Sequence, residues 1–207
     1  MIVCIGVDLS FNSTGICLKY YDEHNEKIVK EYFVIIKPNK LTKKEIKEDS
    51  ESINFEYVLY EKIDLKEYND NNIIHEYWKT TNIINLADRI KETIYEYCKD
   101  PEITNIYVVI EGISYGSTLR TKAVFDLAGL NYVIRKNLIN RENIKLYIVP
   151  PTHIKKFATG KGNANKDDII SIFKLTHKDI KISKIDDLAD AYYMSCYGLE
   201  LYKNTDK

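Results

Sequence analysis

The chain has 207 residues, 44% of them hydrophobic, enough for one sizeable core in a single domain that carries an insertion. No run approaches the roughly 20 apolar residues of a membrane span, and no signal-peptide pattern opens the chain. We therefore expect no membrane association and an intracellular protein, cytoplasmic or nucleoid-associated in a bacterium or phage. Four scattered cysteines without a C-x-x-C pair exclude the usual zinc and redox motifs and indicate buried thiols: Cys4, Cys17, Cys98 and Cys196.

The net charge of -1 conceals a division along the chain. Residues 112–181 hold 13 Lys and Arg against 5 Asp and Glu, a net of +8, so the remainder has a net of -9. A basic segment beside an acidic one is a plausible footprint for a nucleic acid. Ordinary solvated helix faces would give the same counts, so charge alone leaves both interpretations open.

The first half of the chain predicts three strands and an insertion. Apolar runs at 2–8, 14–20 and 31–36 are separated by turn-like residues, which is typical of an antiparallel meander. From 37 to 77 the pattern loosens, and residues 41–77 carry 5 Lys against 10 Asp and Glu, a net of -5. We interpret 37–77 as an acidic insertion that contains one further candidate strand at 55–60.

The second half alternates helices and strands. Residues 78–98 place apolar side chains at helical spacing, and 106–111 is the almost wholly apolar run of a central parallel strand. The remaining expected elements are a helix at 118–139, a strand at 144–149, a break at Pro150-Pro151, and helices near 165–175 and 184–202. This order predicts an α/β fold with a mixed five-stranded sheet, three antiparallel strands followed by two parallel ones, and helices on both faces.

Two carboxylates terminate strands that should lie in the middle of this sheet. Asp8 ends the first strand and Glu111 ends the fourth, so both acids should face the crevice beyond the strand ends. Asp187 and Asp190 are three residues apart on the last helix and project from the same side. Each acid alone could cap a turn or meet a helix dipole, but Asp190 lies further into the helix between two alanines.

Four converging acids repel one another unless divalent cations neutralise them, and hard oxygen ligands select Mg²⁺ or Mn²⁺. Two such ions roughly 4 Å apart can activate a water molecule and stabilise the leaving oxygen of a phosphodiester. The pattern therefore indicates metal-dependent phosphoryl chemistry on a polyanion.

At this point the sequence resembles the RuvC-type Holliday-junction resolvases of the RNase H-like superfamily. The acidic motifs occur in the same order, as Ile5-Gly6-Val7-Asp8-Leu9-Ser10 with Ser13-Thr14-Gly15, Val109-Ile110-Glu111, and Asp187-Leu188-Ala189-Asp190-Ala191. Residues 120–134 resemble the helix after the second motif, and 150–170 resemble the basic, glycine-containing loop that follows. The resemblance spans most of the chain except 37–77, and a composition rich in Asn, Ile, Lys and Tyr suggests a viral or phage member.

The resemblance implies an RNase H-like nuclease, a homodimer that binds four-way DNA junctions and nicks them symmetrically, with two Mg²⁺ ions per active site. It implies catalytic and metal-binding roles for Asp8, Glu111, Asp187 and Asp190. The expected DNA contacts, with Lys166 nearest the scissile group and Tyr115 a candidate for stacking on an unpaired base, are Lys155, Lys156, Lys161, Lys166, Tyr115, Arg120 and Lys122. The neighbouring Asp186 leaves open whether Asp186 or Asp187 points at the metal, although the spacing to Asp190 favours Asp187.

Three other functions remain open. The run from Gly6 to Gly15 also resembles the first phosphate loop of ATP-binding phosphotransferases of the actin and sugar-kinase fold, but a second Asp-Gly loop and a Gly-Gly adenosine site are missing from the sequence. A junction-binding protein without catalysis would have little need for four acids. A nuclease that prefers flaps or forks would use the same residues.

Overall fold

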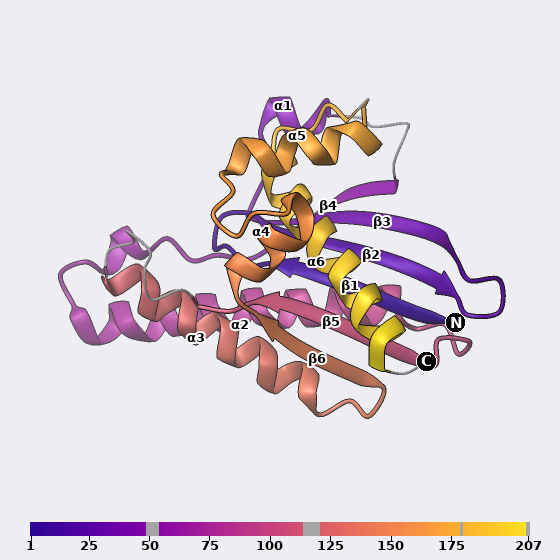
Figure 1. Cartoon of the computed structure of the whole chain (residues 1–207). Helices are drawn as coiled ribbons and strands as arrows, with labels where there is room; N and C mark the ends of the chain where they lie inside the picture. Colours follow the sequence, from indigo (N-terminus) through magenta and orange to yellow (C-terminus); the bar gives the residue numbers. More distant parts are fainter. Residues whose placement is uncertain (49–53, 114–120, 179, 206–207) are drawn as a thin grey trace.

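The computed structural model describes residues 1–48, 54–113, 121–178 and 180–205, and the side chains of 121 and 122 are left out. In this part of the chain six strands form one sheet in the order β4-β3-β2-β1-β5-β6 (Figure 1). The strands are β1 (Ile2–Asp8), β2 (Thr14–Asp22), β3 (Lys27–Pro38), β4 (Asn54–Tyr60), β5 (Asn105–Glu111) and β6 (Ile144–Val149).

The pairing of the strands confirms most of the expected topology. Strands β1, β2 and β3 form the antiparallel meander, and β5 and β6 run parallel to β1. The expected number of five strands was one too few, because β4 pairs in parallel with the outer edge of β3. The acidic 37–77 segment therefore contributes a strand to the sheet itself.

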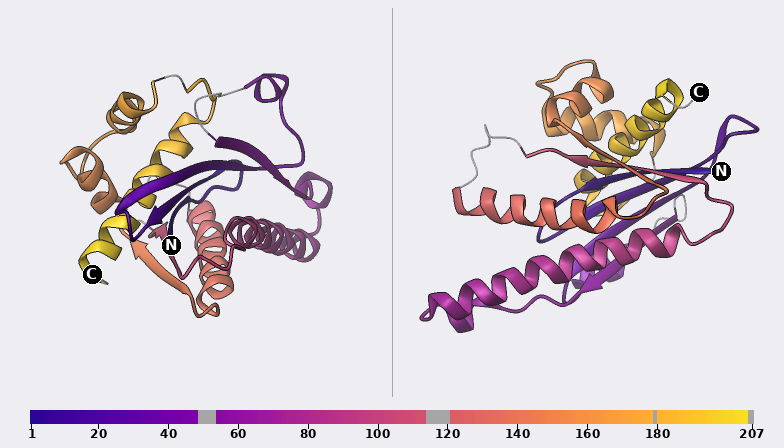
Figure 2. Two further views of the ribbon diagram at one scale, coloured as in Figure 1. Left: turned by 90° about the vertical axis from the view of Figure 1, so that its right-hand side faces the viewer. Right: turned by 90° about the horizontal axis from the view of Figure 1, so that it is seen from below.

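The helices cover both faces of the sheet. α2 (Asn72–Tyr97) and α3 (Thr121–Ile139) lie on one face, whereas α4 (Pro151–Thr159), α5 (Lys166–Thr176) and α6 (Ile185–Thr205) lie on the other (Figure 2). Short helical turns, α1 (Lys43–Ile46) and η1 (Leu65–Tyr68), belong to the acidic segment. None of the helices in the described ranges is long and apolar enough to cross a membrane.

Two helix boundaries differ from those expected. α2 begins at residue 72 rather than 78, because the Asn71 side chain accepts hydrogen bonds from the backbone N–H groups of Ile73 and Ile74 and caps the helix there. The break expected at Pro150-Pro151 is the start of α4 instead. Pro151 stands in the first turn, where its missing N–H group costs no hydrogen bond.

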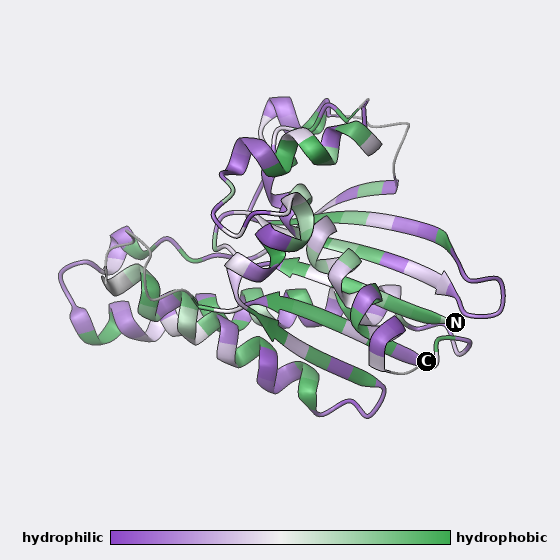
Figure 3. Cartoon of the chain, in the orientation of Figure 1, coloured by the Kyte–Doolittle hydropathy of each residue, from purple (hydrophilic) through white to green (hydrophobic). Residues whose placement is uncertain are grey.

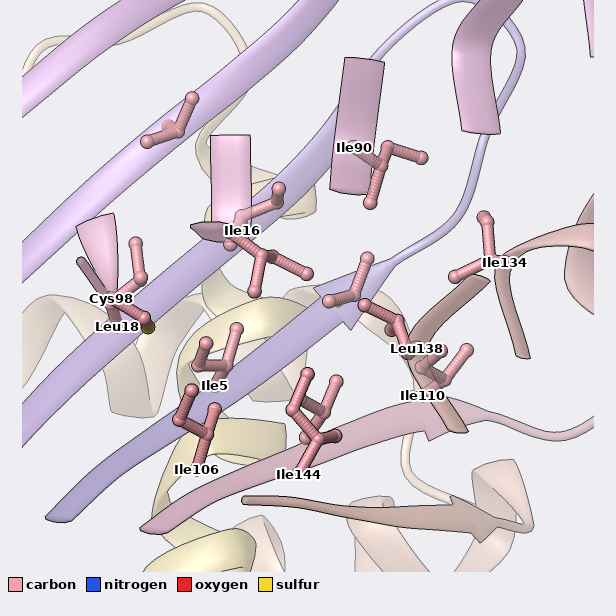
Figure 4. Packing of buried hydrophobic residues seen from close by; sticks show 14 of the residues in the cluster. Ile5, Ile16, Leu18, Ile90, Cys98, Ile106, Ile110, Ile134, Leu138 and Ile144 are labelled. Carbon is pink, nitrogen blue, oxygen red and sulfur yellow. The ribbon is translucent and has the colours of Figure 1, made fainter. Parts of the chain in front are cut away.

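The larger apolar core lies between the sheet and the pair α2 and α3. Side chains from β1, β2, β5 and β6 meet Ile90 of α2 and Ile134 and Leu138 of α3 there (Figure 4). Hydrophobic residues run along β1 and β5, while the outer surfaces of the helices are largely hydrophilic (Figure 3). Three of the four cysteines are buried and all four are unpaired, in agreement with the sequence. The buried core of β1 and β5 thus supports the strand ends where Asp8 and Glu111 stand.

Two glycines allow α6 to approach the other face closely. A Cβ atom at Gly6 of β1 would lie 2.0 Å from the backbone oxygen of Ala191, and one at Gly15 of β2 would lie 2.3 Å from the backbone oxygen of Asp187. No larger residue fits at either position without moving the helix backbone. Glycine at these positions brings the first turns of α6 directly over the ends of β1 and β2.

Candidate active site

The register of the central strands places Asp8 and Glu111 side by side. Val7 of β1 pairs with Ile110 of β5 in a parallel ladder, so the next residue of each strand is an acid at the same edge of the sheet. Both side chains are partly buried. The two strand-end acids therefore stand next to each other at the carboxyl edge of the sheet, as expected from the sequence.

The other two predicted acids come from α6. Asp187 and Asp190 stand one turn apart, and both carboxylates are close enough to Asp8 to raise its pKa. Leu188, Ala189 and Ala191 are fully buried, and they hold the first turns of α6, with Asp187 and Asp190, close to the sheet. The structure therefore brings the four predicted acids into one neighbourhood.

Burial and mutual repulsion dominate the electrostatics of the site. Burial, followed by the charges of Asp190, Glu111 and Asp187, holds the pKa of Asp8 well above its ordinary value. Burial and the Asp190 charge raise the pKa of Glu111 to about 7. Burial also raises the pKa of Asp190 to about 6, although Lys166 opposes this shift. Such shifts in a cleft are typical of functional sites, where ionised groups lack compensating partners.

The structure distinguishes Asp186 from Asp187. Asp186 forms an ion pair with Lys166 of α5 at 2.6 Å, and this bond outweighs burial and lowers the pKa of Asp186. Burial raises the pKa of Asp187, and its carboxylate accepts a hydrogen bond from the Ser13 hydroxyl, which opposes that rise. Asp187 is therefore the acid directed at the cluster, while Asp186 holds a lysine beside it.

A cavity of about 220 Å³ opens next to the acids. Glu111 and Asp190 line it together with Lys155 of α4 and Lys166 of α5. The charges of the two lysines oppose the rise in pKa that burial causes: Lys155 opposes it at Glu111 and Asp190, and Lys166 opposes it at Asp190. A cavity lined by both acids and lysines offers ligands for a cation and donors for a phosphate group.

The remaining predicted DNA contacts are not part of this cavity. Lys156 and Lys161 are exposed and do not line it. Tyr115 and Arg120 lie outside the described residues, and the side chain of Lys122 does as well. Of the five predicted lysine contacts, four have described side chains, and of these the structure brings Lys155 and Lys166 to the acids.

Asn131 of α3 has a role that was not predicted from the sequence. It is 2% exposed, and its amide donates a hydrogen bond of 3.0 Å to the backbone oxygen of Glu111. A buried amide on an otherwise apolar helix face was the available signal, since such a group needs a partner. Asn131 positions the end of β5 and hence the Glu111 carboxylate.

The donor set suits a hard divalent cation, but it is not gathered around one point. Within the described ranges, no three histidine, cysteine or carboxylate side chains lie close enough together to hold a metal ion as they stand. The acids are nevertheless coupled through their charges. Mg²⁺ prefers carboxylate oxygens as ligands, and a bound ion would neutralise the repulsion among these four acids. The residues present therefore fit such an ion when their side chains move closer to one another.

Comparison with known proteins identifies the fold. The chain is similar to RuvC of Thermus thermophilus, with a TM-score of 0.52, 12% identity, and coverage of 97% of this chain and 96% of that one. The same protein in complex with a Holliday junction substrate gives a TM-score of 0.54 at 10% identity, again over 97% and 96%. The yeast mitochondrial Holliday junction resolvase gives 0.50 at 14% identity, over 97% of this chain and 81% of that one.

No protein-family model matches the sequence, and no curated protein does either. The likeness is therefore one of structure at low sequence identity. It confirms the expected fold, the RNase H-like fold of RuvC-type resolvases, over nearly the whole chain.

Proposed function

We propose that this protein is a metal-dependent endonuclease that cleaves phosphodiesters in branched DNA, with four-way junctions as its substrate. The observation that carries the proposal is the convergence of Asp8, Glu111, Asp187 and Asp190 at the carboxyl edge of the central strands. The fold supports it, because the structures that it resembles are those of Holliday junction resolvases. One of these is shown with its junction substrate.

In this proposal the four acids would hold two Mg²⁺ ions, for which Mn²⁺ would substitute. Bound there, the ions would lower the pKa of an attacking water and stabilise the leaving oxygen. The chain's own residues hold the acids in place: Ser13 orients Asp187 through its hydroxyl, and Asn131 fixes the backbone at Glu111. Repulsion among ionised carboxylates is the cost that cation binding would relieve.

Positioning of the substrate falls to the lysines. Lys155 and Lys166 line the same cavity as Glu111 and Asp190 and would bind the phosphate there, with Lys166 held in place by Asp186. Exposed Lys156 and Lys161 would contact the flanking backbone, a contribution that is independent of sequence. Paired, symmetric nicks need two active centres on one junction, so the proposal includes a homodimer.

The decisive experiment compares a labelled four-way junction with a linear duplex of the same sequence, in Mg²⁺ and in EDTA. We expect cleavage of the junction in Mg²⁺, no cleavage in EDTA, and a loss of at least about 100-fold with Asp8→Asn. Asp88→Asn on α2 is the matched control, because it removes one carboxylate on the opposite face of the sheet and should leave cleavage unchanged.

The outcomes separate the alternatives. Equal cleavage of junction and duplex would contradict branch specificity, and full activity of Asp8→Asn would contradict the assigned site. A flap and a replication fork in the same panel test the nearest alternative, since a flap or fork nuclease would cut these faster than the junction. Failure to cut any DNA would favour a phosphotransferase.

A further inference from the structure

A cavity at the ends of β3 and β4 lies on the same edge of the sheet as the acids and has no role in the proposal so far. It has a volume of about 430 Å³. Its strand ends share an edge with Asp8, because β4 runs parallel to β3, and both β1 and β3 run antiparallel to β2. The cavity belongs to the acidic 37–77 segment, which the sequence resemblance to RuvC-type resolvases does not cover.

Hydrogen bonds hold this segment against the turn at 9–13 that follows Asp8. Asn39 has a positive φ of 58°, which asparagine tolerates better than most residues. Its side chain donates a hydrogen bond of 3.0 Å to the backbone oxygen of Lys62 and accepts one of 2.8 Å from the Lys62 N–H group. The Tyr60 hydroxyl donates a hydrogen bond of 2.8 Å to the backbone oxygen of Phe11. The wall of the cavity is thus fixed to the turn.

Lys62 lines the cavity and carries a charge without an anion. It is half-buried, and its Nζ atom donates a hydrogen bond of 3.2 Å to the neutral amide oxygen of Asn12. Within the described part of the chain, no carboxylate lies within ion-pair distance of it. Burial lowers the pKa of Lys62, and the charge of Asp64 opposes this shift. A partly buried ammonium group that lacks an anion is suited to bind one.

The other polar groups of the cavity also favour an anion. Lys66 supplies a second, exposed ammonium group, and Asn69 supplies an amide. Asp64 is the one carboxylate among the lining residues that the structure describes, and it accepts a hydrogen bond of 3.0 Å from the backbone N–H group of Lys66. Two cations therefore stand against one acid that already has a donor.

The turn at 9–13 connects this cavity with the acids. Asn12 accepts the hydrogen bond from Lys62, and the next residue, Ser13, donates its hydroxyl hydrogen bond to Asp187. Consecutive Cα atoms are only about 3.8 Å apart, so the two sites adjoin on either side of one short turn. A DNA strand cleaved at the acids would bring a neighbouring phosphate within reach of Lys62.

We infer that Lys62, supported by Lys66, binds a backbone phosphate of the DNA other than the scissile one. The DNA would then be held on both sides of the acids, by Lys155 and Lys166 in one cavity and by Lys62 in the other. Phosphate contacts of this kind fix the register of the DNA without reading its sequence. The inference rests on the proposed function and extends it, because it assigns a DNA contact to a segment whose net charge is acidic.

The test uses Asp8→Asn protein as the parent, in Mg²⁺, so that a fluorescein-labelled four-way junction is bound without being cut. Fluorescence anisotropy measures the affinity at several KCl concentrations. Lys62→Gln should weaken binding about fivefold and reduce the slope of log affinity against log salt by about 1, because one phosphate contact is lost. Lys62→Arg keeps the charge and should bind within about twofold of the parent.

Two control variants separate charge from position. Lys27→Gln removes the same charge from an exposed side chain at the start of β3, at the opposite edge of the sheet, and should change affinity less than about 1.5-fold. Asn12→Ala removes the hydrogen-bond acceptor of Lys62 but leaves the ammonium group, so the salt slope should stay that of the parent. A slope lowered as much by Asn12→Ala as by Lys62→Gln would mean that Lys62 only positions the turn, and would overturn the inference.

Junctions that each carry one uncharged methylphosphonate linkage, at successive positions along one strand, identify the phosphate. The parent should lose about fivefold in affinity at one linkage other than the scissile one, and Lys62→Gln should lose nothing further there. Additive losses at every linkage would show that Lys62 binds no single phosphate.

The same measurements separate this inference from the proposed function. If Lys62→Gln binds like Lys27→Gln while the parent still prefers the junction to a linear duplex, the inference fails and the proposed function stands. If the parent binds no branched DNA, both are wrong.

Discussion

Two charged clusters lie where α6 meets the sheet, and they are built in opposite ways. At its N-terminal end, Asp8, Glu111, Asp187 and Asp190 gather like charges whose repulsion and burial raise the pKa of each. One turn further along the helix, the 2% exposed Lys19 of β2 pairs with Glu31 of β3.

In this second cluster each charge has a partner. His177 lies 3.0 Å from the Glu31 carboxylate, and the Lys19 ammonium stands 3.8 Å from the ring centre of Tyr192. Burial alone would raise the pKa of Glu31, but the bonds to His177 and Lys19 outweigh it and lower that pKa. Folding thus pairs the charges beside the middle of α6 with partners of opposite sign, whereas the four acids at the start of α6 remain uncompensated. The uncompensated cluster is the one to associate with function.

Breaking the compensated cluster of Lys19, Glu31 and His177 should have the largest effect on stability. Glu31→Gln leaves the Lys19 ammonium buried without its anion, and we expect the free energy of unfolding to fall by about 3 kcal/mol in urea denaturation. Glu96→Gln is the matched control, because Glu96 pairs with Lys99 at the surface and should cost less than about 0.5 kcal/mol. Equal losses in the two variants would show that the buried pair is no better coupled than a surface one.

The pH dependence of stability should reflect the raised pKa values in the uncompensated cluster of four acids. In the folded protein the pKa values of Glu111 and Asp190 are raised to about 7 and about 6, above about 4.3 and 3.9 in an unfolded chain. The folded state therefore takes up protons first, and the free energy of unfolding should rise by about 2 kcal/mol as the pH falls from 8 to 5. Glu31, whose pKa is lowered, opposes this only as the pH falls further.

The variant Glu111→Gln/Asp190→Asn should lose most of this rise when its denaturation is measured at the same pH values. A rise of the same size in the variant would assign the proton uptake to other groups.

A smaller effect is expected from a single acid of the unbalanced cluster. Asp8→Asn removes repulsion with three neighbours, so we expect the free energy of unfolding at pH 8 to increase by about 1 kcal/mol although cleavage is lost. Thermal unfolding of parent and variant in EDTA measures this. A variant less stable than the parent would mean that the Asp8 charge is compensated in the folded protein.

Sequence patterns were sufficient for the central sheet and the four acids. The strand-end pair Asp8 and Glu111 was predictable because each acid follows an apolar run. The α6 pair Asp187 and Asp190 was predictable because the acids are three residues apart on a largely apolar helix. Strand β4 was harder to predict, because its alternating polar and aromatic residues lie within an acidic segment that resembles an insertion. α4 was missed because two consecutive prolines indicate a break as readily as a helix start.

Features that depend on the placement of distant side chains were not predictable. The choice between Asp186 and Asp187 depends on Ser13 and Lys166, which meet them only in the folded chain. A cleft of about 370 Å³ is lined by Arg135 of α3, Ile148 of β6 and Thr152 of α4, residues that share no sequence pattern. The hydrogen bond from the Asn131 amide to the backbone oxygen of Glu111 is a contact of the same kind.

The central claim, that the unbalanced acids exist to hold divalent cations, is tested most directly by thermal unfolding at pH 8 with and without saturating Mg²⁺. A ligand that binds only the folded state raises the melting temperature. We predict a rise of several degrees for the parent protein, no rise for Asp8→Asn, and no rise for either in KCl of equal ionic strength. The same Mg²⁺-induced rise in parent and variant, or none in the parent, would contradict the claim.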